Sequence, residues 1–244
     1  MLPLISIMPL ESSPDRFSTT CWTRVIASRG DSTVAAAALS ELCGDYYEPI
    51  VAFIRHSERD PHCARDLAHS FFAHVLEGHA FAGADPNRGR FRSYLLGAVK
   101  HFLAQNWVKA NRLKRGGEAE VVPIDESAAD QRNPGISPDD VFDRHWATTV
   151  LNRALDALKS ECDETDNGQL FQQLRPWLTG DATHGNQAKL AEQIRMEPNT
   201  LKSHVSRLRK RFRECVREEV ARTLSDPAQT EEEMRSLLAA LRKK

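Results

Sequence analysis

The stretch that decides the fold is QAKLAEQIRMEPNTLKSHVSRLRKRF, residues 187–212. It holds two helical patterns separated by a short turn. Leu190, Ala191 and Ile194 share one face of the first pattern, and Met196 follows at the turn. Apolar residues recur at helical spacing through the second pattern, at Leu201, Val205, Leu208 and Phe212. This spacing predicts a helix-turn-helix in which both helices bury their apolar faces.

The second helix of this motif has a mainly polar and basic outer surface. Its apolar stripe leaves on the other faces Asn199, Lys202, Ser203, Ser206, Arg207, Arg209, Lys210 and Arg213. A recognition helix in the DNA major groove has this division, because polar residues near its start reach base edges and later cations bind phosphates. The alternative is a basic surface helix whose charges are simply solvated. The preceding helix at turn spacing favours DNA binding.

The charge distribution is uneven, although the formal net charge of the 244 residues is only −1. Residues 100–115 hold five Lys and Arg and no acid, and residues 202–213 hold a second basic block. Residues 118–140 between them carry seven acids against Arg132 alone. Basic blocks of this kind are the usual electrostatic footprint of phosphate binding.

The five cysteines are odd in number and include no CxxC pair, which favours free thiols in a reducing compartment. The apolar opening, residues 1–10, is too short to span a membrane and lacks the basic start of a signal peptide. These features predict a cytoplasmic protein with no membrane segment.

Helical spacing dominates the rest of the chain and predicts an all-α fold. Further helices are expected over residues 34–57, 60–78, 90–112, 141–158, 169–178 and 231–241. The stretch 118–139 has no helical period and is rich in acids and prolines, so it is read as a linker. We therefore expect two small helical domains joined by an acidic linker. The predicted boundaries are a disordered tail 1–16, a first domain 17–117, the linker 118–140, a second domain 141–224 and a helical tail 225–244.

Three segments resemble one known family. PNTLKSHVSRLRKRFRE, residues 198–214, resembles the second helix of region 4 in sigma-70-type factors. DLAHSFFAHVLEG, residues 66–78, resembles region 2.2, and RFRSYLLGAVKHFLAQNWVKANRLKR, residues 90–115, resembles regions 2.3 and 2.4. The segments follow family order and no third domain separates them. This layout is similar to the extracytoplasmic-function (ECF) group of RNA polymerase sigma factors.

The resemblance implies a non-enzymatic protein that needs no metal or cofactor. Its first domain would bind the clamp coiled coil in the largest subunit of core RNA polymerase and the melted minus-10 strand of promoter DNA. Its second domain would read the minus-35 element. An anti-sigma factor is a further candidate partner. The protein would thus direct promoter recognition and transcription initiation by sequence-specific DNA binding.

The resemblance also assigns residues. The polymerase-binding positions are Asp66, His69, Ser70, Phe72 and Ala73. The minus-10 positions are Asp85, Asn87 and Arg88 in the loop 78–90, and Arg92, Lys100, Gln105, Asn106, Lys109 and Arg112 on the strand-facing helix. The minus-35 positions are Asn199, Thr200, Lys202, Ser203, Ser206, Arg207, Lys210 and Arg211.

Two features have alternative interpretations. Trp107 lies among these cations and is assigned to the minus-10 site because an aromatic ring can stack on an unpaired base. Aromatic residues on helices more often pack on a domain core. The acidic linker suits a positively charged channel built for nucleic acid, or it is a solvated spacer.

The sequence departs from the family pattern in a few places. His69 and Ser70 stand where the family often has Gln-Glu. Arg195 occupies the turn position that often carries Gly, where a positive φ costs about 1 kcal/mol in a residue with a side chain. Glu197 replaces a frequent Ser cap. The C-terminal helix, 231–241, extends beyond the usual end and is expected to pack on its own chain.

Two rival functions were weighed against the sigma factor. A helix-turn-helix transcription regulator with a helical sensory domain explains residues 187–212 equally well. It leaves the segments at 66–78 and 90–115 unexplained. A metal enzyme is disfavoured, because His69, His74 and His79 recur every five residues, whereas helical zinc sites prefer ligands four residues apart.

Overall fold

The computed structural model describes residues 33–57, 63–76, 90–114, 136–179 and 186–243. Within these ranges every regular element is helical, which confirms the predicted all-α class. The helices are α2 (Thr33–Ser57), α3 (Ala64–Leu76), α4 (Phe91–Lys114), α5 (Pro138–Glu164), α6 (Gly168–Leu174), α7 (Pro176–Thr179), α8 (Asn186–Gln193), α9 (Pro198–Arg222) and α10 (Thr230–Arg242). A 3₁₀ turn, Pro227–Gln229, precedes α10. None of these helices is both long enough and apolar enough to cross a membrane.

One predicted helix is divided in two. The single helix expected over 169–178 is broken at Arg175 into α6 and α7. Pro176 lacks the backbone N–H that would continue the hydrogen-bond ladder, so a new helix starts there. The predicted linker and N-terminal tail fall largely or wholly outside the described residues.

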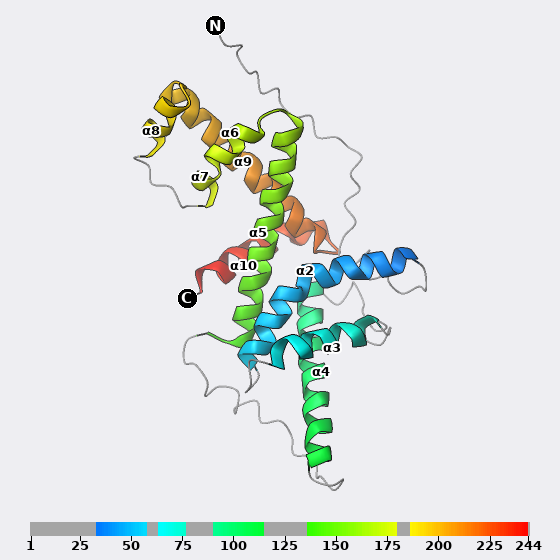
Figure 1. The fold of residues 1–244 in the computed structure, drawn as a ribbon. Helices are drawn as coiled ribbons and strands as arrows, with labels where there is room; N and C mark the ends of the chain where they lie inside the picture. Colours follow the sequence, from blue (N-terminus) through cyan, green and yellow to red (C-terminus); the bar gives the residue numbers. More distant parts are fainter. Residues whose placement is uncertain (1–32, 58–62, 77–89, 115–135, 180–185, 244) are drawn as a thin grey trace.

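Helix α5 is the central element of the fold (Figure 1). Ser137 begins it, since its Oγ accepts a hydrogen bond from the Asp140 backbone N–H at 3.1 Å, and Pro138 occupies the first turn. One end of α5 packs against α2, and the rest packs along α9. Its buried face contains Phe142, Trp146, Ala147, Val150, Ala154, Leu155 and Leu158.

The main hydrophobic core extends from the first half of the chain into the second. It joins Ile50 and Ile54 of α2, Val220 of α9 and Leu237 of α10, which pack around α5, and it extends through α2 to Phe71 of α3. Burial of this apolar surface is what holds the described helices together. The two domain boundaries stay predictions, but the buried core crosses them.

A second, smaller core lies under the helix-turn-helix. It consists of Leu174, Trp177, Ala191, Leu201 and Val205, with partly buried Leu170, Leu190, Ile194, Met196 and Leu208 packed around it. The apolar positions predicted for both helices of the motif are among these residues, except Phe212, which packs against the main core. The unit is therefore a separate small core attached to the main core by α9, which is 25 residues long.

Candidate nucleic-acid interface

The turn between α8 and α9 has the geometry that the sequence predicted. Arg195 has φ 54°, in the left-handed region, which confirms the strained position expected there. The Met196 backbone N–H donates to the Ala191 carbonyl at 2.8 Å and closes α8. These contacts set the crossing of the two helices, and the partly buried Met196 side chain packs in the core beneath.

Glu197 begins α9 in place of a Ser cap. Its Oε2 accepts a hydrogen bond from the Thr200 backbone N–H at 2.8 Å, and Pro198 follows in the first turn. Backbone hydrogen bonds from Thr200 and Asn199 lower the pKa of the Glu197 carboxyl. A carboxylate at this end of a helix also interacts favourably with the helix dipole.

The start of α9 divides into a buried and an exposed face, as predicted. Leu201, His204 and Val205 are buried. The exposed face contains Asn199, Thr200, Lys202, Ser203, Ser206, Arg207 and Lys210. Within the described part of the chain, the three cations of this face form no salt bridge, so their charges are available to a ligand.

Arg211, predicted as a DNA contact, is paired with acids of its own chain. Its guanidinium forms ion pairs with Glu161 of α5 at 2.6 Å, and with Glu214 and Glu218 of α9 at 3.3 and 3.0 Å. Hydrogen bonding to Glu161 raises the pKa of Arg211 well above its usual value. The side chain joins α9 to α5 and does not lie with the exposed cations.

The predicted polymerase-binding residues lie on α3, and most are exposed. Asp66, His69, Ser70 and Ala73 are solvent-exposed, and His69 Nε2 lies 2.9 Å from the Tyr47 hydroxyl of α2. Phe72 is the exception, because it is buried with its ring stacked on Tyr47 at a centroid distance of 5.9 Å. Phe72 therefore packs beneath the exposed residues of α3 and is not itself accessible to a partner.

The C-terminal half of α4, from about residue 103 onward and here called its outer half, carries the exposed part of the predicted minus-10 site. Trp107 is 56% exposed, so in this structure it does not cap the core. Lys109 is exposed and Asn106 is half-buried. Gln105 Nε2 lies 2.8 Å from His101 Nε2.

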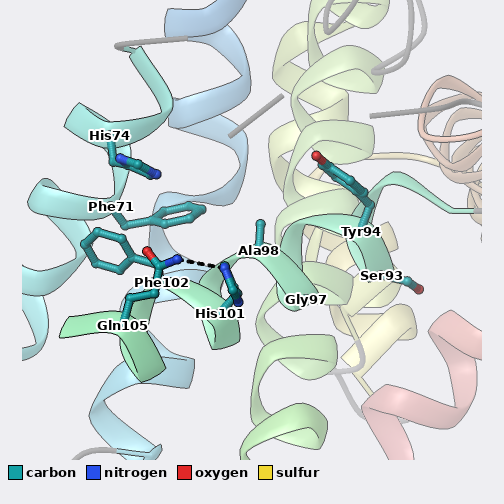
Figure 2. Close-up of a pocket in the computed structure, with 9 residues that line it drawn as sticks. All are labelled: Phe71, His74, Ser93, Tyr94, Gly97, Ala98, His101, Phe102 and Gln105. Carbon is teal, nitrogen blue, oxygen red and sulfur yellow. Dashed lines mark hydrogen bonds between the residues drawn. The ribbon is translucent and has the colours of Figure 1, made fainter. Parts of the chain in front are cut away.

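A cavity of about 580 Å³ opens beside this surface, between α3 and α4 (Figure 2). Phe71 and His74 line it from α3, and Tyr94, His101, Phe102 and Gln105 line it from α4. Sequence reasoning missed these lining residues, apart from Gln105. The spacing of His101 and Gln105, one helical turn apart, is the signal that places them on one face.

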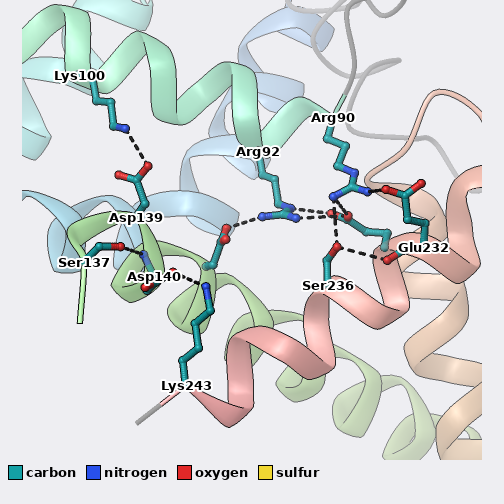
Figure 3. Close-up of polar contacts among 11 residues, drawn as sticks. Arg90, Arg92, Lys100, Ser137, Asp139, Asp140, Glu232, Ser236 and Lys243 are labelled. Carbon is teal, nitrogen blue, oxygen red and sulfur yellow. Dashed lines mark hydrogen bonds and ion pairs between the residues drawn. The ribbon is translucent and has the colours of Figure 1, made fainter. Parts of the chain in front are cut away.

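Two predicted minus-10 cations in the first half of α4 also pair with acids of the same chain (Figure 3). Arg92 is buried: its Nε donates to Glu233 of α10 at 2.6 Å, it pairs with Asp143 of α5, and its guanidinium lies 4.5 Å from the Trp146 ring centroid. Burial lowers the pKa of Arg92, but Glu233 and Asp143 outweigh it and the pKa is raised overall. Lys100 pairs with Asp139 of α5 at 2.8 Å, although it stays half-exposed.

The remaining predicted residues cannot be placed. Asp85, Asn87 and Arg88 lie outside the described residues. Arg112 belongs to α4, but its side chain also lies outside the described part. The exposed positions therefore form two surfaces, one at the start of α9 and one on α3 and the outer half of α4.

Comparison of the chain with protein-family models, curated proteins and solved structures gave no match.

Proposed function

We propose that this protein is a sigma-type specificity factor, without catalytic activity of its own, that binds core RNA polymerase in the cytoplasm and directs it to promoters. In this proposal the start of α9 reads a duplex element upstream. The outer half of α4 binds the melted strand, and α3 docks on the polymerase. The runner-up function is a helix-turn-helix regulator that binds duplex DNA without polymerase.

The observation that carries the proposal is the exposed polar face at the start of α9. Leu201 and Val205 fix this face on a small core, and the Glu197 cap fixes its first turn. The major groove of DNA admits an α-helix, and residues near the start of a recognition helix contact the base edges there. Lys202 and Arg207 have no salt bridge among the described residues, so binding a phosphate or a base breaks no internal pair.

A second observation favours a sigma factor over a regulator. α4 exposes Trp107 and, two residues further along the helix, Lys109, and single-strand binding uses aromatic rings for stacking and cations for the backbone. A regulator of duplex DNA has no need for such a surface. The exposed polar row of α3, with Asp66 and Ser70, suits a protein partner.

The test is transcription in vitro with core polymerase and this protein on fragmented DNA from the source organism, with transcript 5′ ends mapped. We expect new starts that share two upstream elements at a fixed spacing. Absence of new starts, together with tight duplex binding by the protein alone, would establish the regulator instead.

Variants in that assay test the separate roles of the α9 and α3 surfaces. Lys202→Ala and Arg207→Ala are expected to reduce promoter-specific transcription while polymerase binding is unchanged, and Arg235→Ala, an exposed cation of α10, serves as the control. Asp66→Ala is expected to weaken the polymerase complex, with exposed Glu164→Ala as its control. Full transcription by the α9 variants would remove that helix from the reading role.

A further inference from the structure

The C-terminal helix α10 connects the two halves of the molecule through carboxylates. Glu233 Oε2 lies 2.9 Å from Arg90 Nη1, and Glu233 Oε1 accepts from Arg92 Nε at 2.6 Å. Glu232 pairs with Arg90 at 2.6 Å, and Ser236 accepts from Arg90 at 3.2 Å (Figure 3). At the far end of α10, Lys243 pairs with Asp140 of α5 at 2.6 Å.

The centre of this contact is closed to water. The side chain of Glu233 is 0% exposed and that of Arg92 is 9% exposed. A charge in such a place is stable only while its partner is present, because an unpaired buried charge is costly. Arg92 binds both oxygens of Glu233 through Nε and Nη2, the bidentate geometry that also suits a phosphate, and Arg90 pairs with Glu232 and Glu233.

Apolar packing holds the same helix in place. Leu237 and Ala240 of α10 are buried in the main core, and Met234 and Leu241 pack at its edge. The opposite face is exposed, with Leu238 at 48%. α10 is therefore bound to α5 through a narrow apolar stripe and to α4 through ion pairs, and it contacts α9 as well.

From these contacts we propose that α10 is an autoinhibitory latch. Its carboxylates occupy Arg90 and Arg92 in place of nucleic-acid phosphates, and its position fixes α4 relative to α9. Release of α10 frees Arg90, removes one of the two carboxylates that pair with Arg92, and lets the two binding surfaces separate. The inference rests on the proposed function, since it requires that α4 bind nucleic acid.

Neighbouring acids of α10 supply a matched pair of variants. Glu232 pairs with Arg90, the residue before α4, and Glu231 pairs with Arg217 of α9 at 2.5 Å. Their side chains are 64% and 66% exposed, so neither substitution disturbs the core. Glu232→Lys and Glu231→Lys change the net charge equally, but only Glu232→Lys repels α4.

A second pair acts through the apolar stripe. Leu237→Asp places a carboxylate at a position that is 1% exposed, and Leu238→Asp places the same charge on the exposed neighbour. The first is expected to expel α10, and the second to leave it bound. The added charge is negative in both, so any gain in DNA binding by Leu237→Asp over Leu238→Asp comes from release.

Two measurements on the full chain test the latch. Hydrogen exchange should become faster in peptides that cover the start of α4 and α10 for Glu232→Lys and Leu237→Asp relative to their controls. Binding of a single-stranded DNA oligonucleotide should become tighter relative to the controls. Its dependence on salt should steepen, because one more phosphate contact, at Arg90, changes the slope of log K against log salt by about 0.7.

The outcomes separate the latch from the proposed function. Faster exchange without a steeper slope overturns autoinhibition, and so does unchanged exchange in Leu237→Asp. If exchange and slope both change but no variant supports transcription with core polymerase, the latch stands and the promoter role of the protein fails.

Discussion

Helices α4 and α9 both carry cations that the sequence predicts to contact DNA, but the cations in the first half of each helix differ in their partners. The exposed cations at the start of α9, Lys202 and Arg207, form no salt bridge within the described residues. Arg92 and Lys100 of α4 are paired with acids of α5 and α10. A basic stretch of sequence thus shows where positive charge is concentrated. Whether these cations can bind a ligand depends on acids that are distant in the sequence.

The largest expected effect is on the free energy of unfolding, at the buried ion pairs between Glu233 and the two arginines. Glu233→Ala leaves Arg90 and Arg92 without their shared carboxylate, so the free energy of unfolding should fall by about 3–5 kcal/mol. Glu231→Ala breaks only an exposed pair and should cost about 0–1 kcal/mol. Chemical denaturation of both variants measures the difference. Equal losses would mean that the α4–α10 contact is not the stronger one.

A smaller effect separates the two lysines. Lys202→Ala removes a cation without an internal partner, so the salt dependence of duplex DNA binding should weaken by about 1 in the slope of log K against log salt. Lys100→Ala removes a cation already paired with Asp139 and should leave that slope unchanged. Fluorescence anisotropy across a salt series measures both slopes. A similar change for both variants would show that pairing in the structure does not limit binding.

Most of the fold follows from local pattern. The helix-turn-helix was predictable because Leu201 and Val205 repeat at helical spacing and Pro198 marks a start. The strained turn at Arg195 was expected from the family resemblance, because the family often has Gly at that position. The break at Arg175 was missed because the apolar period continues across Pro176, and the missing N–H there outweighs periodicity.

The candidate site was less predictable, for a physical reason. Exposure along one helix follows from its own apolar stripe, so Lys202 and Arg207 were placed correctly on the exposed face. The pairing of Arg92 with Glu233, or of Arg211 with Glu161, joins residues 141 and 50 positions apart. Such contacts depend on how helices pack in three dimensions, and the helical period of one segment carries no information about them.

The smallest effect concerns His204, which lies under the exposed face of α9. Burial lowers the pKa of His204, and the charge of Arg207 lowers it further. The folded state therefore binds fewer protons than the unfolded state as the pH falls below about 6.5, and stability should decrease through that window.

Removing the Arg207 charge tests this coupling. Arg207→Gln should raise the pKa of His204 towards its ordinary value, as measured by an NMR titration of the imidazole, and should reduce the loss of stability on acidification. Lys210→Gln removes another exposed cation of the same helix, one that does not contribute to the lowered pKa of His204, so this pKa should stay unchanged. If both variants shift the pKa alike, the effect is one of total charge on α9. If only Arg207→Gln shifts the pKa, the charge of Arg207 on the exposed face of α9 acts on the buried His204 imidazole. Arg92 and Lys100 of α4 differ, because their charges are paired with carboxylates of α5 and α10.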